Sequence, residues 1–206
     1  MSEEIAVFLC DKTGNMARPW DEAGYECYCV DVQHSIRKEK VVGNTHFVWG
    51  DVRSWIPPRG KRIVFMAAFS PCTHLAVSDA RDFKTKGIPM LCDGLGLFGH
   101  CIQLCEWSCA PYCAENPTGV ISTHFRKPDF TFDPCDYGDP YTKKTCLWTG
   151  GGFVMPPKTP VAPSLGSMMH KMPPSKDRAN QRSATPSGFA KAVFAANRPM
   201  AQRLTA

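Results

Sequence analysis

Residues 63–74 read IVFMAAFSPCTH, an apolar run that passes into a polar loop containing a proline. A short apolar run bounded by a turn predicts a buried strand, here from Ile63 to Ala68. The loop after this strand presents one thiol, Cys72, directly behind the proline. Residues 113–117, CAENP, place a carboxylate, Glu115, at the end of another short apolar stretch. Together the two segments indicate a cysteine nucleophile that works beside an acid.

Similar apolar runs recur along the chain and alternate with segments of helix length. The expected strands are Ile5 to Leu9, Tyr25 to Val30, His46 to Trp49, Ile63 to Ala68, Tyr112 to Ala114 and Thr145 to Trp148. Such alternation predicts an α/β fold with a mostly parallel, doubly wound sheet. Ligands of these sheets bind at the carboxyl ends of the strands. Five polar residues fall there: Asp11, Asp31, Asp51, Cys72 and Glu115.

The composition favours a single globular domain, since 206 residues suffice for one sizeable core and 43% of them are hydrophobic. The start of the chain is acidic and its first apolar run is short, so we expect no secretory signal. The eleven cysteines are then expected to be reduced thiols of a cytoplasmic protein. Charged residues interrupt the apolar stretches, so we expect no membrane span.

The longest predicted helix runs from about Leu91 to Cys109 and carries Cys101, Cys105 and Cys109 at helical spacing. A zinc cluster is one interpretation of this stripe. The paired CxxC spacing of structural zinc sites is missing, however, and free cysteine is commonly buried. We therefore expect core packing and no metal.

The chain divides into three parts by composition. Residues 1–149 form the expected core, residues 150–175 a proline-rich loop, and residues 176–206 a segment that returns to the core. Within the last part, Arg182 to Ser187 is predicted to be a loop with a helix cap. A helix is expected from Gly188 to Asn197.

The first strand leads into the turn Asp11-Lys12-Thr13-Gly14, and the second strand ends at Asp31. Nucleotide-binding βαβ units place a ribose-binding carboxylate about twenty residues after such a turn. A plain turn at Gly14 and a helix cap at Asp31 fit the same pattern, so other residues must decide. Asp51 adds a third acid after a third strand.

The whole set resembles the DNA cytosine-5 methyltransferase family, in particular its short phage and bacterial members. Four segments carry the resemblance in the family's order, over nearly the whole chain: Ser70-Pro71-Cys72, Glu115-Asn116-Pro117, Lys143-Lys144-Thr145 and Arg182-Ser183-Ala184-Thr185-Pro186. The resemblance implies a Rossmann-like methyltransferase fold, S-adenosylmethionine as cofactor, DNA as substrate, and a bacterial cell or phage-infected host. The residues that it assigns to the cofactor are Asp11, Gly14, Asp31, Asp51, Ser70, Pro71, Ser183 and Thr185.

The same resemblance assigns the chemistry. Cys72 adds to carbon 6 of cytosine, so that carbon 5 becomes nucleophilic enough to accept a methyl group, while Glu115 stabilises the ring at nitrogen 3. The sequence identifies no base for the carbon-5 proton. Lysine is no equivalent of arginine, which the family carries near positions 143 and 144. The residues expected to contact substrate are Asn116, Lys143, Lys144 and Arg81.

Full-length members of the family carry a target-recognition domain, for which the proline-rich loop leaves little room. Recognition is then relaxed, is supplied by a specificity partner or a homodimer, or concerns a smaller substrate. In a duplex, the cytosine must be flipped out, and the loop from Thr73 to Lys86 is the candidate to fill the gap. The alternatives are methylation of a free cytosine nucleotide or of RNA, and a non-catalytic module that binds nucleic acid or a partner.

Overall fold

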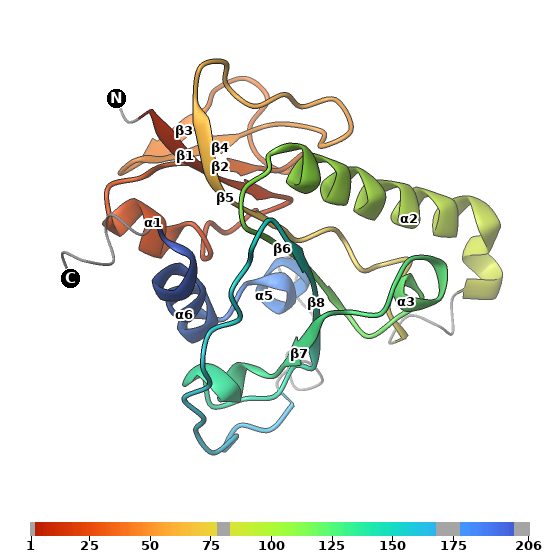
Figure 1. Ribbon diagram of the computed structural model, residues 1–206. Helices are drawn as coiled ribbons and strands as arrows, with labels where there is room; N and C mark the ends of the chain where they lie inside the picture. The colour runs from red at the N-terminus through yellow and green to blue at the C-terminus, as the bar shows by residue number, and fades with distance from the viewer. Residues whose placement is uncertain (1–2, 78–82, 168–177, 200–206) are drawn as a thin grey trace.

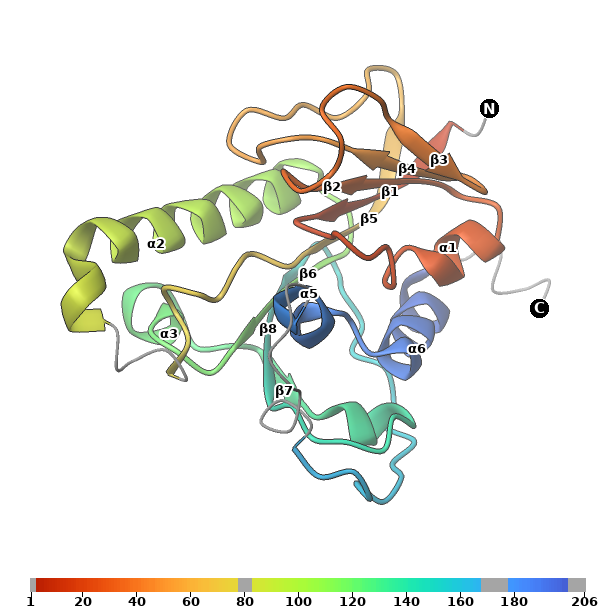
Figure 2. The same ribbon diagram turned by 180° about the vertical axis from the view of Figure 1, so that it is seen from behind.

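The computed structural model describes residues 3–77, 83–167 and 178–199. One eight-stranded sheet runs through the molecule (Figures 1 and 2). Its strands are β1 (Glu4–Leu9), β2 (Glu26–Val30), β3 (Lys40–Val42), β4 (Thr45–Val48), β5 (Arg62–Ala68), β6 (Tyr112–Pro117), β7 (Phe130–Phe132) and β8 (Thr145–Gly150). The order across the sheet is β3-β4-β2-β1-β5-β6-β8-β7.

The centre of this sheet is parallel. β1 lies between β2 and β5 and is parallel to both, β4 extends the sheet beyond β2, and β6 extends it beyond β5, all parallel. The chain therefore builds outward in two directions from the β1–β5 pair, as in a doubly wound sheet. β3, β8 and β7 join antiparallel to their neighbours. The expected α/β fold with a mostly parallel sheet is confirmed, and so is each of the six expected strands.

Helices cover both faces of the sheet: α1 and α6 lie on one face and α2 on the other (Figures 1 and 2). The helical elements are α1 (Arg18–Glu22), α2 (Phe83–Trp107), α3 (Ile121–His124), the short 3₁₀ helix η2 (Pro134–Tyr137), α5 (Arg178–Ser183) and α6 (Ser187–Asn197). Two expectations were wrong in part. The helix expected from Leu91 begins eight residues earlier, so the end of the Thr73 to Lys86 segment is helical, and Arg182 and Ser183 belong to α5 rather than to a loop.

The expected helix near Gly188 is confirmed as α6, but its cap comes from far along the chain. Pro186 stands at the N-cap position and makes no side-chain capping bond. Instead, Asp139 Oδ2 accepts the Gly188 N–H at 2.9 Å. A carboxylate at a helix N-terminus satisfies an otherwise unpaired donor and complements the helix dipole.

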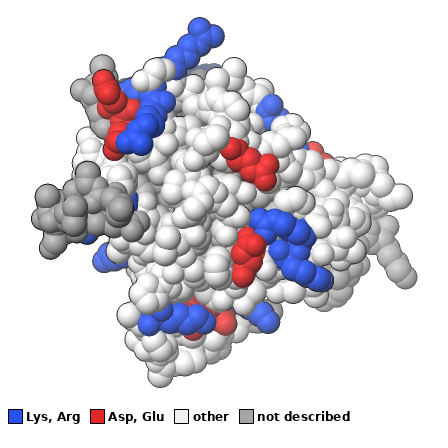
Figure 3. Space-filling model, viewed as in Figure 1, with Lys and Arg blue, Asp and Glu red and all other residues white. Residues whose placement is uncertain are grey.

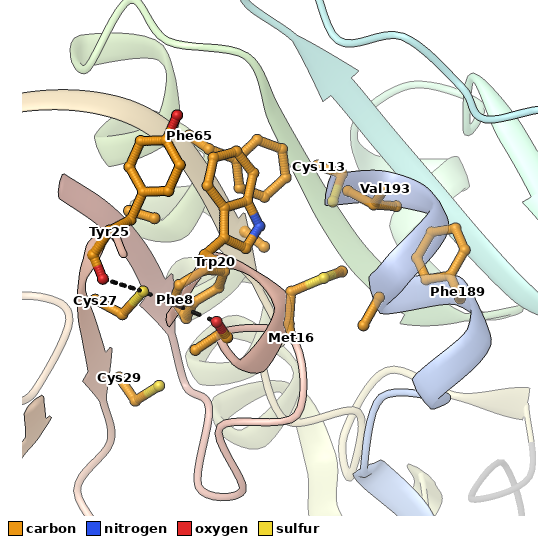
Figure 4. Packing of buried hydrophobic residues seen from close by; sticks show 14 of the residues in the cluster. Phe8, Met16, Trp20, Tyr25, Cys27, Cys29, Phe65, Cys113, Phe189 and Val193 are labelled. Carbon is orange, nitrogen blue, oxygen red and sulfur yellow. Dashed lines mark hydrogen bonds between the residues drawn. The ribbon is translucent and has the colours of Figure 1, made fainter. Parts of the chain in front are cut away.

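The first core cluster fills the space between the sheet and the pair α1 and α6 (Figure 4). Trp20 of α1 is fully buried and stacks on Phe65 of β5, with ring centroids 4.7 Å apart. Phe189 and Val193 of α6 belong to the same cluster. Burial of such side chains contributes about 1.5–3 kcal/mol each, so the C-terminal helix is held against the sheet by its apolar face.

The second core cluster lies under α2, where Cys101 and Cys105 are fully buried. The predicted core packing of the cysteine stripe is confirmed for these two residues and is wrong for Cys109, which is exposed. α2 ends at Trp107 and the chain leaves the helix, so that Cys109 has a left-handed φ of 55°. α2 is also interrupted at Gly87, where φ is 68° and ψ is −176°.

The segment Gly87–Trp107 of α2 is long and apolar enough to cross a membrane by length and composition. Asp93 and Glu106 interrupt this segment as expected, but they leave it apolar enough to meet the criterion, so the expectation that no stretch approaches a membrane span is wrong for this helix. Its buried residues nevertheless pack on β5, β6 and β8 in the second cluster. Only 28% of its most apolar window is buried, so one side of the helix packs on the sheet and much of its apolar surface is exposed.

The proline-rich segment after β8 folds back on η2. Residues 151–167 form no helix or strand, and 168–175 lie outside the described residues. Val161 N–H donates to the Cys135 carbonyl at 2.9 Å, and Thr159 N–H donates to the Asp136 carbonyl at 2.8 Å. The described part is therefore an ordered loop that is tied to the body of the protein.

Candidate functional site

A cavity of about 850 Å³ opens at the carboxyl ends of the parallel strands. Its walls come from the segments after β1, β2, β4 and β5, from β6, from the segment before β8, and from α5. Eleven of the predicted site residues line it: Asp11, Asp31, Asp51, Ser70, Pro71, Cys72, Glu115, Lys143, Lys144, Ser183 and Thr185. Gly14 and Asn116 lie outside this lining, and Arg81 lies outside the described residues.

Cys72 begins a single helical turn after β5. Its carbonyl accepts the N–H groups of Leu75 and Ala76, both at 2.9 Å, and its side chain is partly exposed where it lines the cavity. Ala76 forms a bridge with Gly119, and Val120 N–H donates to the Leu75 carbonyl at 2.9 Å. The turn that carries the thiol is thus fastened to the segment that follows β6.

Asn116 makes a second connection between the same two segments. The residue is buried, and its amide Nδ2 donates to the carbonyl of Ser70 at 2.9 Å and to Ser70 Oγ at 3.2 Å. These bonds hold the start of the Cys72 loop against β6. Asn116 therefore lies behind the loop rather than in the cavity, where it was expected to meet substrate.

Glu115 faces the cavity from β6 and forms an ion pair with Lys143. Lys143 Nζ lies 3.7 Å from Glu115 Oε1, and the two side chains expose only 12% and 14% of their surface. The N–H of Lys143 donates to Asp133 Oδ1 at 2.8 Å, which fixes the backbone beside this pair. Tyr141 also lies nearby: burial, and then the charges of Asp139 and Glu115, raise its pKa to about 12.

Asp11 is buried at the end of β1, and its carboxylate organises the loop that follows. Oδ1 accepts the N–H groups of Gly14 and Thr13, at 2.8 and 2.9 Å, and the Thr13 hydroxyl at 3.1 Å. Oδ2 has no hydrogen-bond partner among the described residues. Burial raises the pKa of Asp11, against the lowering effect of these bonds, and the charge of Asp31 raises it further.

Gly14 has a local role in this loop. Its φ is 70°, a left-handed conformation that glycine adopts without strain. A Cβ at this position would stand 2.9 Å from the ring of Phe47. The turn and the packing against Phe47 are sufficient reasons for a glycine here.

Asp31 and Asp51 extend the acidic side of the cavity. Asp31 is buried, and its Oδ1 accepts the Gln33 N–H at 2.7 Å. Asp51 Oδ1 accepts the Arg53 N–H at 3.0 Å and lies 3.6 Å from Arg53 Nη1. Two buried or half-buried carboxylates thus line the wall where a ribose and a base were expected.

The late segment reaches the first loop across the sheet edge. Asn15 Nδ2 donates to the Thr185 carbonyl at 3.2 Å, which joins residues 170 positions apart. Thr185 is buried, whereas Ser183 is exposed and its hydroxyl donates to the Asn180 carbonyl at 3.0 Å. This contact holds the C-terminal segment beside the loop after β1, and residues of α5 form part of the cavity wall.

No protein-family model matches this chain, and a search among curated proteins finds no relative. Several lining residues were not predicted from the sequence, and these lie within two positions of predicted ones: Cys10, Lys12, Thr13, Val32, Gln33, Val52 and Arg53. Each of these residues follows the end of a strand, and this position was the feature of the sequence that could have identified it.

Acidic and basic side chains are mixed on the molecular surface. Figure 3 shows acidic side chains beside several of the basic ones on one face. Arg126 Nη1 lies 2.6 Å from Asp129 Oδ1, and Lys158 Nζ lies 3.0 Å from Asp136 Oδ2. Pairing of this kind reduces the positive potential available to a polyanion.

Proposed function

We propose that this protein transfers a methyl group from S-adenosylmethionine to carbon 5 of cytosine in DNA, through a covalent adduct of Cys72. One observation carries the proposal: a single cavity holds a partly exposed thiol and an ion-paired carboxylate beside three aspartates at neighbouring strand ends. A site that only binds has no need of a nucleophile next to an acid. The resemblance to DNA cytosine-5 methyltransferases supports the same assignment.

The acidic side of the cavity suits the cofactor. When bound, S-adenosylmethionine supplies an electrophilic methyl group and carries a positively charged amino group, ribose hydroxyls and an adenine. Asp11 offers a buried carboxylate oxygen that has no partner among the described residues, as an acceptor for a cationic group. Asp31 would accept from the ribose hydroxyls. Val32 and Val52 give the wall near Asp51 apolar surface for a flat ring.

The nucleophilic step belongs to Cys72. Its thiolate forms a bond to carbon 6, and the electrons of the 5,6 double bond move to carbon 5, which takes the methyl group as the methyl–sulfonium bond breaks and S-adenosylhomocysteine leaves. Glu115 would hydrogen-bond nitrogen 3 and stabilise the charge that develops in the ring. A base then removes the proton from carbon 5, the electrons of that carbon–hydrogen bond restore the 5,6 double bond, and the bond between sulfur and carbon 6 breaks so that Cys72 leaves as the thiolate.

The supporting residues keep nucleophile and acid in a fixed relation. Asn116 and the bridge at Gly119 hold the Cys72 turn on β6, and Lys143 holds the carboxylate of Glu115 by its ion pair. Preorganised groups lose little freedom when the substrate arrives, which lowers the barrier.

The decisive experiment supplies methyl-labelled S-adenosylmethionine together with duplex DNA, single-stranded DNA, RNA or dCMP in separate reactions. We expect label in 5-methylcytosine of DNA. Label in none of the four acceptors, with no S-adenosylmethionine binding by calorimetry, would leave a non-catalytic module as the function and contradict the proposal.

A free cytosine nucleotide is the second candidate substrate. The observation in its favour is the loop of residues 151–167, which folds back on η2 in place of a separate lobe that could read a duplex. In the same experiment this candidate predicts that dCMP is methylated without polymer. Transfer that requires a polymer of more than one nucleotide would exclude it.

A further inference from the structure

Cys10 follows β1 in a backbone conformation that is rare for a residue with a side chain. Its φ is 55°, in the left-handed region. The Cys10 N–H donates to the Val30 carbonyl at 2.7 Å, which holds this conformation against the end of β2. Strained residues of this kind concentrate at functional sites. The proposed methyl transfer does not use the Cys10 thiol, so the strain belongs to something else.

The Cys10 side chain lies between the cavity and the second core cluster. It is partly buried, it lines the cavity, and it packs against that cluster. Cys101 of α2 belongs to the same cluster and is fully buried, and the thiols of Cys10 and Cys101 are hydrogen-bonded to each other. A thiol that a small solute can meet from the cavity therefore contacts a thiol that is closed off from solvent.

Other cysteines near this pair lack one of these features. Cys105 lies one helical turn further along α2 and is also buried, but it does not line the cavity. Cys72 lines the cavity with Cys10, at the end of the neighbouring strand β5. Cys105 is therefore a matched control for the buried thiol, and Cys72 is the competitor for the accessible one.

The surroundings of Cys101 keep it a neutral thiol. The hydrogen bond with Cys10, and then burial, raise the pKa of Cys101 well above its ordinary value, while the charge of Arg53 acts in the opposite direction. Oxidants react with the thiolate rather than with the thiol. Burial and protonation both protect Cys101 from direct attack, so Cys10 is the thiol of this pair that an oxidant meets first.

We propose that Cys10 and Cys101 form an oxidation site, at which a hydroperoxide converts the thiol pair into an intramolecular disulfide. With hydrogen peroxide, the Cys10 sulfur bonds to one peroxide oxygen, the O–O bond breaks, and the products are a sulfenic acid at Cys10 and one water. The Cys101 sulfur then bonds to the Cys10 sulfur, and the hydroxide that leaves takes the Cys101 proton to form a second water. Two electrons pass from the thiol pair to the peroxide.

The disulfide would join the end of β1 to α2 and would take the Cys10 thiol out of the cavity wall. Cys10 precedes Asp11, whose carboxylate organises the loop after β1. A thiol pair at this position therefore couples the oxidation state of two core cysteines to one wall of the cavity. Neither thiol takes part in the proposed methyl transfer, so the oxidation site goes beyond that function and does not depend on it.

The test treats the whole protein with hydrogen peroxide, blocks the remaining thiols with iodoacetamide and maps linked peptides by mass spectrometry. We expect fragment ions that join Cys10 to Cys101, and loss of this link when dithiothreitol is added before blocking. Cys101→Ala leaves Cys10 without a resolving thiol, so a sulfenic acid should accumulate at Cys10 and be trapped by dimedone. Cys10→Ser should leave Cys101 reduced at the same peroxide concentration.

Two further variants complete the design. Cys105→Ala and Cys72→Ala should both form the Cys10–Cys101 link to the same extent as wild type. A link from Cys10 to Cys72, or peroxide treatment that oxidises exposed thiols and leaves Cys10 reduced, would overturn the proposal, as would equal loss of the link in Cys105→Ala and Cys101→Ala. Circular dichroism identifies a variant that fails to fold, and the wild-type map needs no variant. Methyl transfer is decided separately by the labelled-methyl reactions.

Discussion

Asn116 is tied to Ser70 by two hydrogen bonds from one amide group, to the carbonyl at 2.9 Å and to the hydroxyl at 3.2 Å. The first residue neighbours Glu115 on β6, and the second lies two positions before Cys72. The bond pair therefore fixes the distance between the two segments that carry the reactive groups. Asn116 acts as a positioning residue in this arrangement.

Replacing Asn116 with alanine should have two effects, one on stability and one on the proposed activity. Loss of bonds to a buried Ser70 should lower the free energy of unfolding by about 1–3 kcal/mol. The methyl-transfer rate should fall at least about tenfold while the affinity for S-adenosylhomocysteine stays within about twofold, because the Cys72 loop loses its anchor. Urea unfolding and single-turnover rates measure the two effects. Asn44→Ala, at an exposed asparagine, is the control, and equal activity in both variants would contradict the positioning role.

Cys72→Ala should abolish methyl transfer, because no other group in the proposed mechanism forms the bond to carbon 6. Cofactor affinity should be unchanged, since the thiol does not bind the methyl donor. An oligonucleotide containing 5-fluorocytosine should trap the wild-type protein covalently, as seen by a shift in mass. Cys92→Ala, at an exposed thiol on α2, should behave as wild type. Wild-type rates in Cys72→Ala would show that the nucleophile lies elsewhere.

Gly119 is predicted to be intolerant of any side chain. A Cβ there would stand 2.0 Å from the Leu75 carbonyl oxygen, so the Cys72 turn would have to move away from β6. Gly119→Ala should lower the free energy of unfolding by about 1–3 kcal/mol and reduce methyl transfer. Gly96→Ala, in open space on α2, should instead raise stability by up to about 1 kcal/mol, because alanine is the better helix former. Equal thermal midpoints for the two variants would contradict this account.

Asp11 gives stability a defined dependence on pH. Burial keeps its pKa above the ordinary 3.8, so the folded protein holds this proton more tightly than the unfolded chain does. The stabilising contribution is complete below the ordinary pKa and is lost as the pH rises through the folded pKa. Asp11→Asn cannot ionise, so its free energy of unfolding should improve relative to wild type as the pH rises from acid toward neutral. Urea titrations at several pH values measure the difference, and parallel profiles for the two proteins would contradict it.

Much of the central architecture could be predicted from local pattern alone. The run before Ser70 is apolar over a strand length and is followed by a polar loop with a proline, and β5 occupies most of it in the structure. The same signal was absent from β3 and β7, which have three residues each, and both valines of β3 are exposed. A strand of three residues is too short to show a period of two, even where one side chain is buried, as Phe132 of β7 is.

Other features depended on where an element ends. Helical spacing predicted that Cys109 shares the buried side of Cys101 and Cys105, but α2 stops at Trp107 and the chain then turns. Helical spacing predicts which residues share a face only for residues that belong to the helix. The position of a helix end depends on how the next segment pairs, and here that segment is β6, which lies between β5 and β8 in the sheet.

The sequence by itself determined which groups stand at strand ends: one thiol, one glutamate and three aspartates follow or end apolar runs whose length fixes them as buried strands. Only the tertiary structure decided how those ends combine. Parallel pairing of the strands places these groups around one cavity. Asn116 bonds to Ser70 behind the Cys72 loop, and Asp11 accepts the Gly14 N–H in the loop after β1. Strand propensity acts over a few neighbouring residues, whereas these contacts join segments that packing alone brings together.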